Sequence, residues 1–161
     1  MRVAVGTDHA GFPLYDMAIE EAKRLGHEVI GVNPPGPPKP DDDYPDFAEL
    51  LAAGVIERGC QRGILICGSG VGAAVAANKI PGIRAGLCHD TYSAHQGVEH
   101  DDVNVLVLGG RVIGPELAKE LIRAFLNAKF THETRHQRRL DKVNAIEARY
   151  AGRLQAKESM R

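Results

Sequence analysis

The chain has 161 residues, enough for one domain to bury a hydrophobic core without disulfides or metal. Its 20 basic and 21 acidic residues nearly balance, so no bulk charge marks a binder of nucleic acid or of a membrane surface. The apolar runs are too short to span a membrane, and the N-terminal stretch MRVAVGTDHAGF lacks the apolar region of a signal peptide. We therefore expect a cytoplasmic protein that binds neither nucleic acid nor membrane.

Short β-branched runs alternate along the chain with segments that are compatible with helices. In chain order, strands are expected at 3–7, 27–32, 63–67, 83–88 and 103–110, and helices at about 13–25, 45–58, 70–79, 91–99 and 115–127. Such alternation predicts a parallel sheet that is covered by helices on both faces. Apolar runs such as ILI and VLVL are typical of strands buried on both sides. The fold class is therefore α/β.

A further amphipathic helix is expected at about 136–156, after the sheet is complete. It has no sixth strand to cover, and such a helix is often a contact between subunits. Packing on a second subunit and packing back on its own domain both remain open. The proline-rich loop at 34–40 is interpreted as a solvated surface excursion.

Residues 67–72, CGSGVG, follow the third strand and open a helix. Ligands of open parallel sheets bind beyond the carboxyl ends of the strands, which is where this segment lies. Glycines let backbone N–H groups approach an anionic or oxygen-rich ligand, and the helix dipole favours negative charge. Cys67 is the last strand residue, beside a helix N-terminus that would stabilise a thiolate. We single it out as reactive and interpret Cys60 and Cys88 as structural.

The same loop permits two other interpretations. Gly68, Gly70 and Ala73 satisfy the G-x-G-x-x-G/A spacing of dinucleotide-binding proteins, and Asp90 lies near the distance expected of a ribose-binding acid. The position of the motif argues against this interpretation, because dinucleotide-binding proteins carry it after the first strand and here it follows the third. A P-loop is excluded because no GK[ST] follows. A tight turn between strand and helix, without function, is the remaining alternative.

Other polar clusters could supply further site residues. Asp8 and His9 follow the first strand, Arg111 follows the fifth, and His100 stands among acids after the fourth helix. The segment RHQRR at 135–139 is basic, but a net charge of −1 and the absence of tryptophan argue against nucleic acid. The three cysteines and seven histidines give no pattern that we interpret as a disulfide framework or a metal site. Taken together, the clusters suggest one site for a small phosphorylated substrate and proton transfer.

These residues, in this order, resemble the ribose-5-phosphate isomerase B family, which includes galactose-6-phosphate and allose-6-phosphate isomerases. The matching segments are DHAGF, DYPD, GILICGSGVGAAVAANK, GIRAGLCHD, EHDD with NVLVLGGR, and RHQRRLDKVNAIE, which together span residues 3 to about 147. The resemblance implies one sugar-phosphate isomerase domain over 1–161, a three-layer α/β/α Rossmann-like sandwich with a five-stranded parallel sheet. It also implies a homodimer or homotetramer with active sites at the dimer interface, and neither metal nor cofactor.

The resemblance also implies roles for individual residues. Cys67 would be the base that moves the proton between C1 and C2, His100 would open the furanose ring, and Ser69 would assist. The implied substrate-binding residues are Asp8, His9, Gly68, Ser69, Gly70, Val71, Gly72, Asp101, Arg111, Arg135 and Arg139. Phosphate is the expected target of at least Arg135 and Arg139.

Asp101 stands where the family usually has asparagine after the histidine, which leaves the sugar open. We expect interconversion of ribose 5-phosphate and ribulose 5-phosphate. The alternatives are another phosphosugar, such as allose 6-phosphate, galactose 6-phosphate or a tetrose phosphate, and a nucleotide-binding module.

Overall fold

The computed structural model describes residues 1–158, with side chains described through 151. Its five strands are β1 (Arg2–Thr7), β2 (Glu28–Gly31), β3 (Arg62–Cys67), β4 (Ala85–Leu87) and β5 (Val105–Gly109). They pair in parallel in the order β2-β1-β3-β5-β4. The prediction of a five-stranded parallel sheet in an α/β fold is confirmed.

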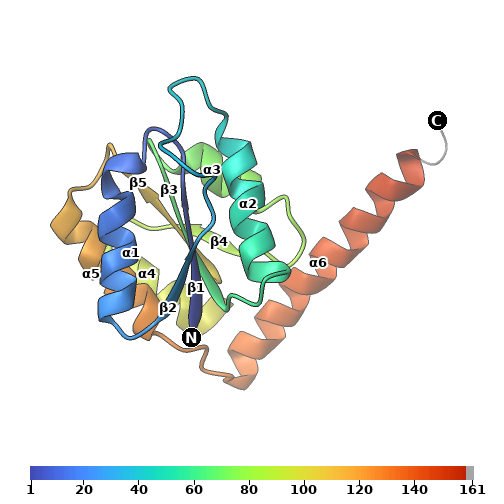
Figure 1. Cartoon of the computed structure of the whole chain (residues 1–161). Coiled ribbons are helices and arrows are strands. Elements are labelled where there is room, and N and C mark those ends of the chain that lie inside the picture. Colours follow the sequence, from blue (N-terminus) through green and yellow to red (C-terminus); the bar gives the residue numbers. More distant parts are fainter. Residues whose placement is uncertain (159–161) are drawn as a thin grey trace.

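Helices cover both faces of this sheet (Figure 1). They are α1 (Tyr15–Arg24), α2 (Tyr44–Ile56), α3 (Val71–Ala77), α4 (Thr91–Asp101), α5 (Pro115–Asn127) and α6 (Thr134–Glu158), with a 3-10 turn at Phe12–Leu14 before α1. One core lies between the sheet and α1, α4 and α5, and a second lies between the sheet and α2 and α3. Successive strand residues point to opposite cores: Ile66 joins the first, and Leu65 and Cys67 join the second.

The strand residues are almost all buried, which explains why their sequences run apolar without alternation. Helix α5 has the predicted bounds, whereas α4 continues two residues past the predicted end at residue 99 and includes His100 and Asp101. The prediction that these two residues follow the helix is wrong. The helix continues until Asp102, whose φ of 49° is left-handed and ends it.

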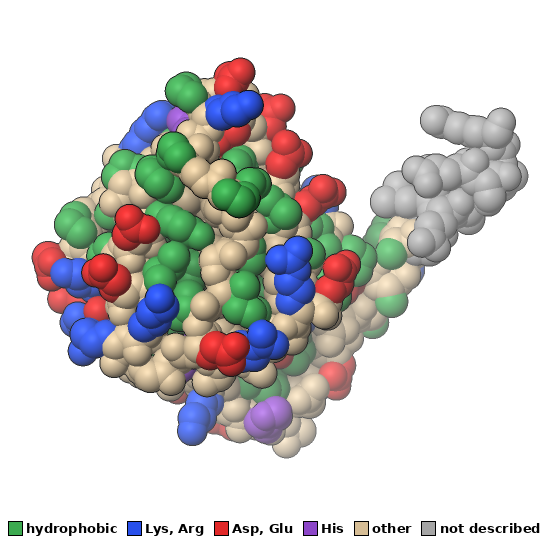
Figure 2. Space-filling view, viewed as in Figure 1, with side chains coloured by type: hydrophobic (Ala, Val, Ile, Leu, Met, Phe, Trp, Pro, Cys, Tyr) green, Lys and Arg blue, Asp and Glu red, His purple; other side chains and the backbone are tan. Residues whose placement is uncertain are grey.

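Helix α6 begins against the body of the molecule and then leaves it (Figures 1 and 2). Near its start His136 and Leu140 are 1% and 8% exposed, so this part packs on its own domain. Farther along, Val143 and Ile146 are each 50% exposed. Its described part therefore combines a docked start with a half-exposed apolar row, Val143 and Ile146. No helix within residues 1–158 is long and apolar enough to cross a membrane.

Candidate functional site

The carboxyl ends of β1 and β3 place Asp8 beside Cys67. Asp8 is 4% exposed, and its Oδ1 accepts hydrogen bonds from the backbone N–H groups of Ala10 and Gly11, both at 2.9 Å. The turn is close to the sheet, since a Cβ on Gly11 would lie 2.5 Å from the backbone carbonyl of Ile66. Asp8 is thus a rigidly held carboxylate at the sheet edge.

Cys67 is 8% exposed, and the pKa of its thiol is raised above the ordinary value. Burial is the main cause, followed by a hydrogen bond to Asp8 and the negative charge of that carboxylate. The backbone N–H groups of Gly68 and Gly70 lower the pKa but do not outweigh these effects. The expectation of a stabilised thiolate is therefore wrong for the single chain. The raised pKa favours the protonated thiol, which donates a hydrogen bond to Asp8.

The glycine loop between β3 and α3 is shaped by close contacts. Gly70 has a φ of 81°, and a Cβ there would lie 2.5 Å from the Leu87 side chain, so only glycine fits. A Cβ on Gly72 would lie 2.8 Å from the ring of Tyr44, which packs on the loop. Tyr44 belongs to the DYPD segment but is not among the residues predicted to form the site.

Three further predicted residues lie on or beside this loop. Ser69 is exposed, and its Oγ accepts a hydrogen bond from the Val71 N–H at 3.3 Å. Arg111 is also exposed, and its backbone N–H donates to the Gly68 carbonyl at 3.0 Å. Its guanidinium lies near the same glycine, because a Cβ on Gly68 would be 3.7 Å from Nη1 of Arg111. A hydroxyl and a cation therefore flank the loop that follows the thiol.

His9 is held by a carboxylate that sequence reasoning missed. Its Nδ1 lies 2.6 Å from Oδ1 of Asp42, and its backbone N–H donates to Oδ2 of Asp42 at 3.1 Å. The Asp42 side chain is only 11% exposed. The run DDDYPD gives no sign of which acid turns inward, so sequence alone offered no signal for this residue.

His100 lies at the other edge of the sheet. Helix α4 starts at the carboxyl edge and runs back for 11 residues, about 16 Å at 1.5 Å per residue. Nδ1 of His100 lies 2.6 Å from the Gln96 Nε2, and its ring stacks on His136 with centroids 4.0 Å apart. Nδ1 of His136 is 2.7 Å from Oγ1 of Thr131. Burial is the main reason that the pKa of His136 is lowered, so this ring favours the neutral form.

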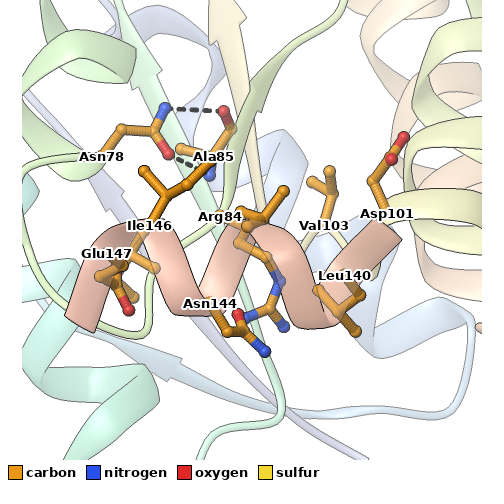
Figure 3. Close-up of a pocket in the computed structure, with 11 residues that line it drawn as sticks. Asn78, Arg84, Ala85, Asp101, Val103, Leu140, Asn144, Ile146 and Glu147 are labelled. Atoms are coloured by element: carbon orange, nitrogen blue, oxygen red, sulfur yellow. Dashed lines mark hydrogen bonds between the residues drawn. The ribbon is translucent and has the colours of Figure 1, made fainter. Parts of the chain in front are cut away.

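The remaining predicted residues lie near His100. Arg135 and Arg139 are exposed near the start of α6, and Nε of Arg135 donates to Oε2 of Glu133 at 2.9 Å. Asp101 is exposed and borders a groove of about 490 Å³ between α6 and the body (Figure 3). Its lining also includes Arg84, Val103, Leu140, Asn144 and Glu147, together with the half-exposed Val143 and Ile146 of α6.

One chain therefore divides the predicted residues between two edges of the sheet. The carboxyl edge holds Asp8, His9, Cys67, Gly68, Ser69, Gly70, Val71, Gly72 and Arg111, whereas the amino edge holds His100, Asp101, Arg135 and Arg139. The suggestion that all of them form one site does not hold within a single chain.

Residues 132–136 also spell HExxH, a spacing that binds zinc when both histidines share one helical face. His132 precedes α6 and has a φ of 55°, so it does not share a helix with His136. Within the described part of the chain, no group of three His, Cys, Asp or Glu side chains could hold a metal ion. Asp90 accepts a hydrogen bond from the Ser93 N–H at 2.7 Å and caps α4, which accounts for this acid without a ribose.

Known proteins share both the sequence and the fold. A family model described as Ribose/Galactose Isomerase matches residues 3–143. Ribose-5-phosphate isomerase B of Escherichia coli is 42% identical over 148 residues, covering 92% of this chain and 97% of that protein. D-erythrulose-4-phosphate isomerase of Pectobacterium atrosepticum is 42% identical over 130 residues, covering 81% and 85%. The structure of Clostridium thermocellum ribose-5-phosphate isomerase B superposes with a TM-score of 0.86 at 41% identity, covering 93% and 99%.

Proposed function

The chain belongs to the ribose/galactose isomerase family and is a sugar-phosphate isomerase, and we propose that it interconverts ribose 5-phosphate and ribulose 5-phosphate. The name of the Escherichia coli relative, which this chain matches over nearly its whole length, supports that substrate. The Pectobacterium relative has the same identity over a shorter span, so a tetrose phosphate is the second candidate.

One observation carries the proposal: the Cys67 thiol lies between an acceptor for its proton and a loop of backbone N–H groups. Asp8 is hydrogen-bonded to the thiol, and Gly68 and Gly70 direct their N–H groups towards the sulfur. Isomerisation of an aldose needs a base for the proton on C2 and donors for the enediolate oxygen that forms. The thiol and the loop together meet both needs.

The proposed reaction is a proton transfer through an enediolate. The thiol proton moves to Asp8, and the Cys67 thiolate then removes the C2 proton of the open-chain aldose. The C2–H electron pair forms the C1–C2 double bond, and the negative charge settles on O1. The O2 hydroxyl then gives its proton to O1, which moves the negative charge to O2. Protonation of C1 by Cys67 lets the O2 electron pair form the C2=O bond of the ketose, and Cys67 recovers its own proton from Asp8. Throughout, the loop N–H groups between Gly68 and Gly72 stabilise the oxygen that carries the charge.

His100 would open the sugar ring, and Arg135 and Arg139 would bind the phosphate. Arg111, which lies on the Cys67 side, would also bind the substrate. These groups lie at opposite sheet edges of one chain, so we propose that a second copy supplies His100, Arg135 and Arg139 to the site of the first. The exposed Val143 and Ile146 of α6 favour such an assembly, because exposed apolar rows often mark contacts between proteins. The assembly is a homodimer or a homotetramer built from such dimers.

A substrate panel tests this function. Ribose 5-phosphate, allose 6-phosphate, galactose 6-phosphate and erythrose 4-phosphate are supplied without added metal to the wild type, Cys67→Ala and Cys88→Ala. Cys88→Ala is the matched control because Cys88 is also buried beside a strand end. We expect ribose 5-phosphate to be the preferred substrate, and Cys67→Ala alone to lose at least about 100-fold in kcat. Turnover that survives loss of Cys67 would contradict the mechanism.

A further inference from the structure

The loop that joins β2 to α2 is anchored at both ends on the last residues of β1 and the turn after it. At its start, the Asn33 side chain accepts from the Thr7 N–H at 2.9 Å and donates to the Thr7 carbonyl at 2.6 Å. At its end, Asp42 binds His9 through both carboxylate oxygens. Five prolines lie between these anchors. Since proline fixes φ, the loop is a stiff strap whose end position is set by its own backbone.

Asp42 differs from the acids on either side of it. Asp41 and Asp43 are exposed, whereas the Asp42 side chain is 11% exposed and faces the protein. The Asp42 N–H donates to the Lys39 carbonyl at 3.1 Å, which closes a turn before this residue. The turn directs Asp42 inward and leaves its neighbours in solvent.

The chemistry of this contact determines where His9 carries its proton. A carboxylate only accepts hydrogen bonds, so Nδ1 of His9 must donate to Asp42. In the neutral ring the second nitrogen, Nε2, is then unprotonated and can accept a hydrogen bond. The His9 side chain is 32% exposed, so it remains open to a ligand.

We propose that Asp42 is a positioning residue, which holds His9 as the Nδ1–H tautomer so that Nε2 accepts a hydrogen bond from a sugar hydroxyl. The inference rests on the proposed function, because it requires the sugar to bind at the edge that carries Cys67. His9 directly follows Asp8, the hydrogen-bond partner of Cys67, so its ring is attached to the turn that holds the proton acceptor. The contact between Asp42 and His9 therefore links the end of the proline-rich strap to the reaction site.

The test combines a spectroscopic and a kinetic measurement on the full chain. Side-chain ¹⁵N NMR of His9 reports the tautomer in the wild type, Asp42→Asn, Asp42→Ala and the matched control Asp41→Asn. We expect a protonated Nδ1 in the wild type and the control, and a shift towards protonated Nε2 in both Asp42 variants. We expect the kcat/KM of the Asp42 variants on the preferred sugar to fall by about 10-fold to 100-fold, the loss that is typical when the partner that orients a metal-binding histidine is removed.

A double-mutant cycle separates positioning from a purely structural effect. In a His9→Asn background, Asp42→Asn should cause no further loss of kcat/KM, because Asp42 acts only through the ring. Equal losses in both backgrounds, or an unchanged His9 tautomer in Asp42→Ala, would overturn the inference. A wild type inactive on every sugar defeats the proposed function itself, whereas an active wild type with an equally active Asp42→Asn defeats only the positioning role.

Discussion

Cys67 and His100 lie at opposite edges of the same sheet. Cys67 ends β3 at the carboxyl edge, and His100 occupies the last turn of α4, which has run back to the amino edge over about 16 Å. Because consecutive parallel strands are joined by helices that run the other way, this separation follows from the fold itself. The two side chains of one chain cannot act on neighbouring atoms of one sugar, so joint action requires two copies.

The reactivity of Cys67 should depend on Asp8. Burial, the hydrogen bond and the charge of Asp8 all raise the pKa of the thiol. Asp8→Asn removes the charge, so the thiolate should form at lower pH, and the pH profile of Cys67 alkylation by iodoacetamide should shift downwards. Mass spectrometry of the Cys67 peptide measures this, and Cys88 is an internal control because burial raises its pKa to about 11. An unshifted profile would show that Asp8 does not control the thiol.

Gln96 should support His100 through the 2.6 Å contact to Nδ1. Gln96→Leu removes this partner and leaves the stacking on His136 as the main restraint, so kcat/KM should fall by about 10-fold to 100-fold through misplacement of the ring. Glu99→Gln is the control, because Glu99 pairs with His95 at 3.0 Å on the same helix. Steady-state kinetics measure kcat/KM for both variants. Equal values for Gln96→Leu and Glu99→Gln would show that Gln96 does not support His100.

The apolar row of α6 should be an assembly contact. Val143→Asp combined with Ile146→Asp places charges where both side chains are 50% exposed, so a single domain should still fold. We expect light scattering to show a monomer, circular dichroism to show native helical content, and the isomerase assay to show no activity. Asp141→Asn, on the opposite face of α6, should keep the wild-type mass. A double variant that remains assembled would show that the row lies outside the interface.

Glu21 should make folding sensitive to acid. Hydrogen bonds from Arg24, aided by Arg123, lower its pKa from 4.5 to about 2 despite burial. A carboxylate whose pKa is lower in the folded than in the unfolded state stabilises the protein above about pH 4.5, and this contribution is lost as the pH falls towards about 2.

Urea unfolding tests this with Glu21→Gln and the neighbouring Glu20→Gln as control. At pH 7 we expect Glu21→Gln to lower the free energy of unfolding by about 1 to 3 kcal/mol, with the control unchanged. Near pH 2 the difference from the wild type should largely vanish. If the difference in free energy of unfolding stayed constant from pH 7 to pH 2, the ionised Glu21 carboxylate and its arginine partners would not be its source.

The sequence predicted the sheet and the carboxyl-edge residues because both depend on local pattern. Apolar runs mark the strands, and Asp8, Cys67 and Arg111 each stand at or just beyond a strand end, so parallel pairing brings them together. The inward turn of Asp42 was not predictable, because it depends on a strap anchored at a distant Asn33. The raised pKa of Cys67 was also missed, since burial and the approach of Asp8 arise only in the folded chain.

Subunit complementation shows whether Cys67 of one copy and His100 of another form one active site. Cys67→Ala and His100→Asn are each expected to be inactive, and they are unfolded together, refolded at equal amounts and assayed on ribose 5-phosphate. Random pairing makes half of the dimers mixed, and each mixed dimer has one site with both native residues, so activity should recover to about one quarter of wild type. No recovery, with mixed dimers shown by mass spectrometry, would contradict a site shared between two copies.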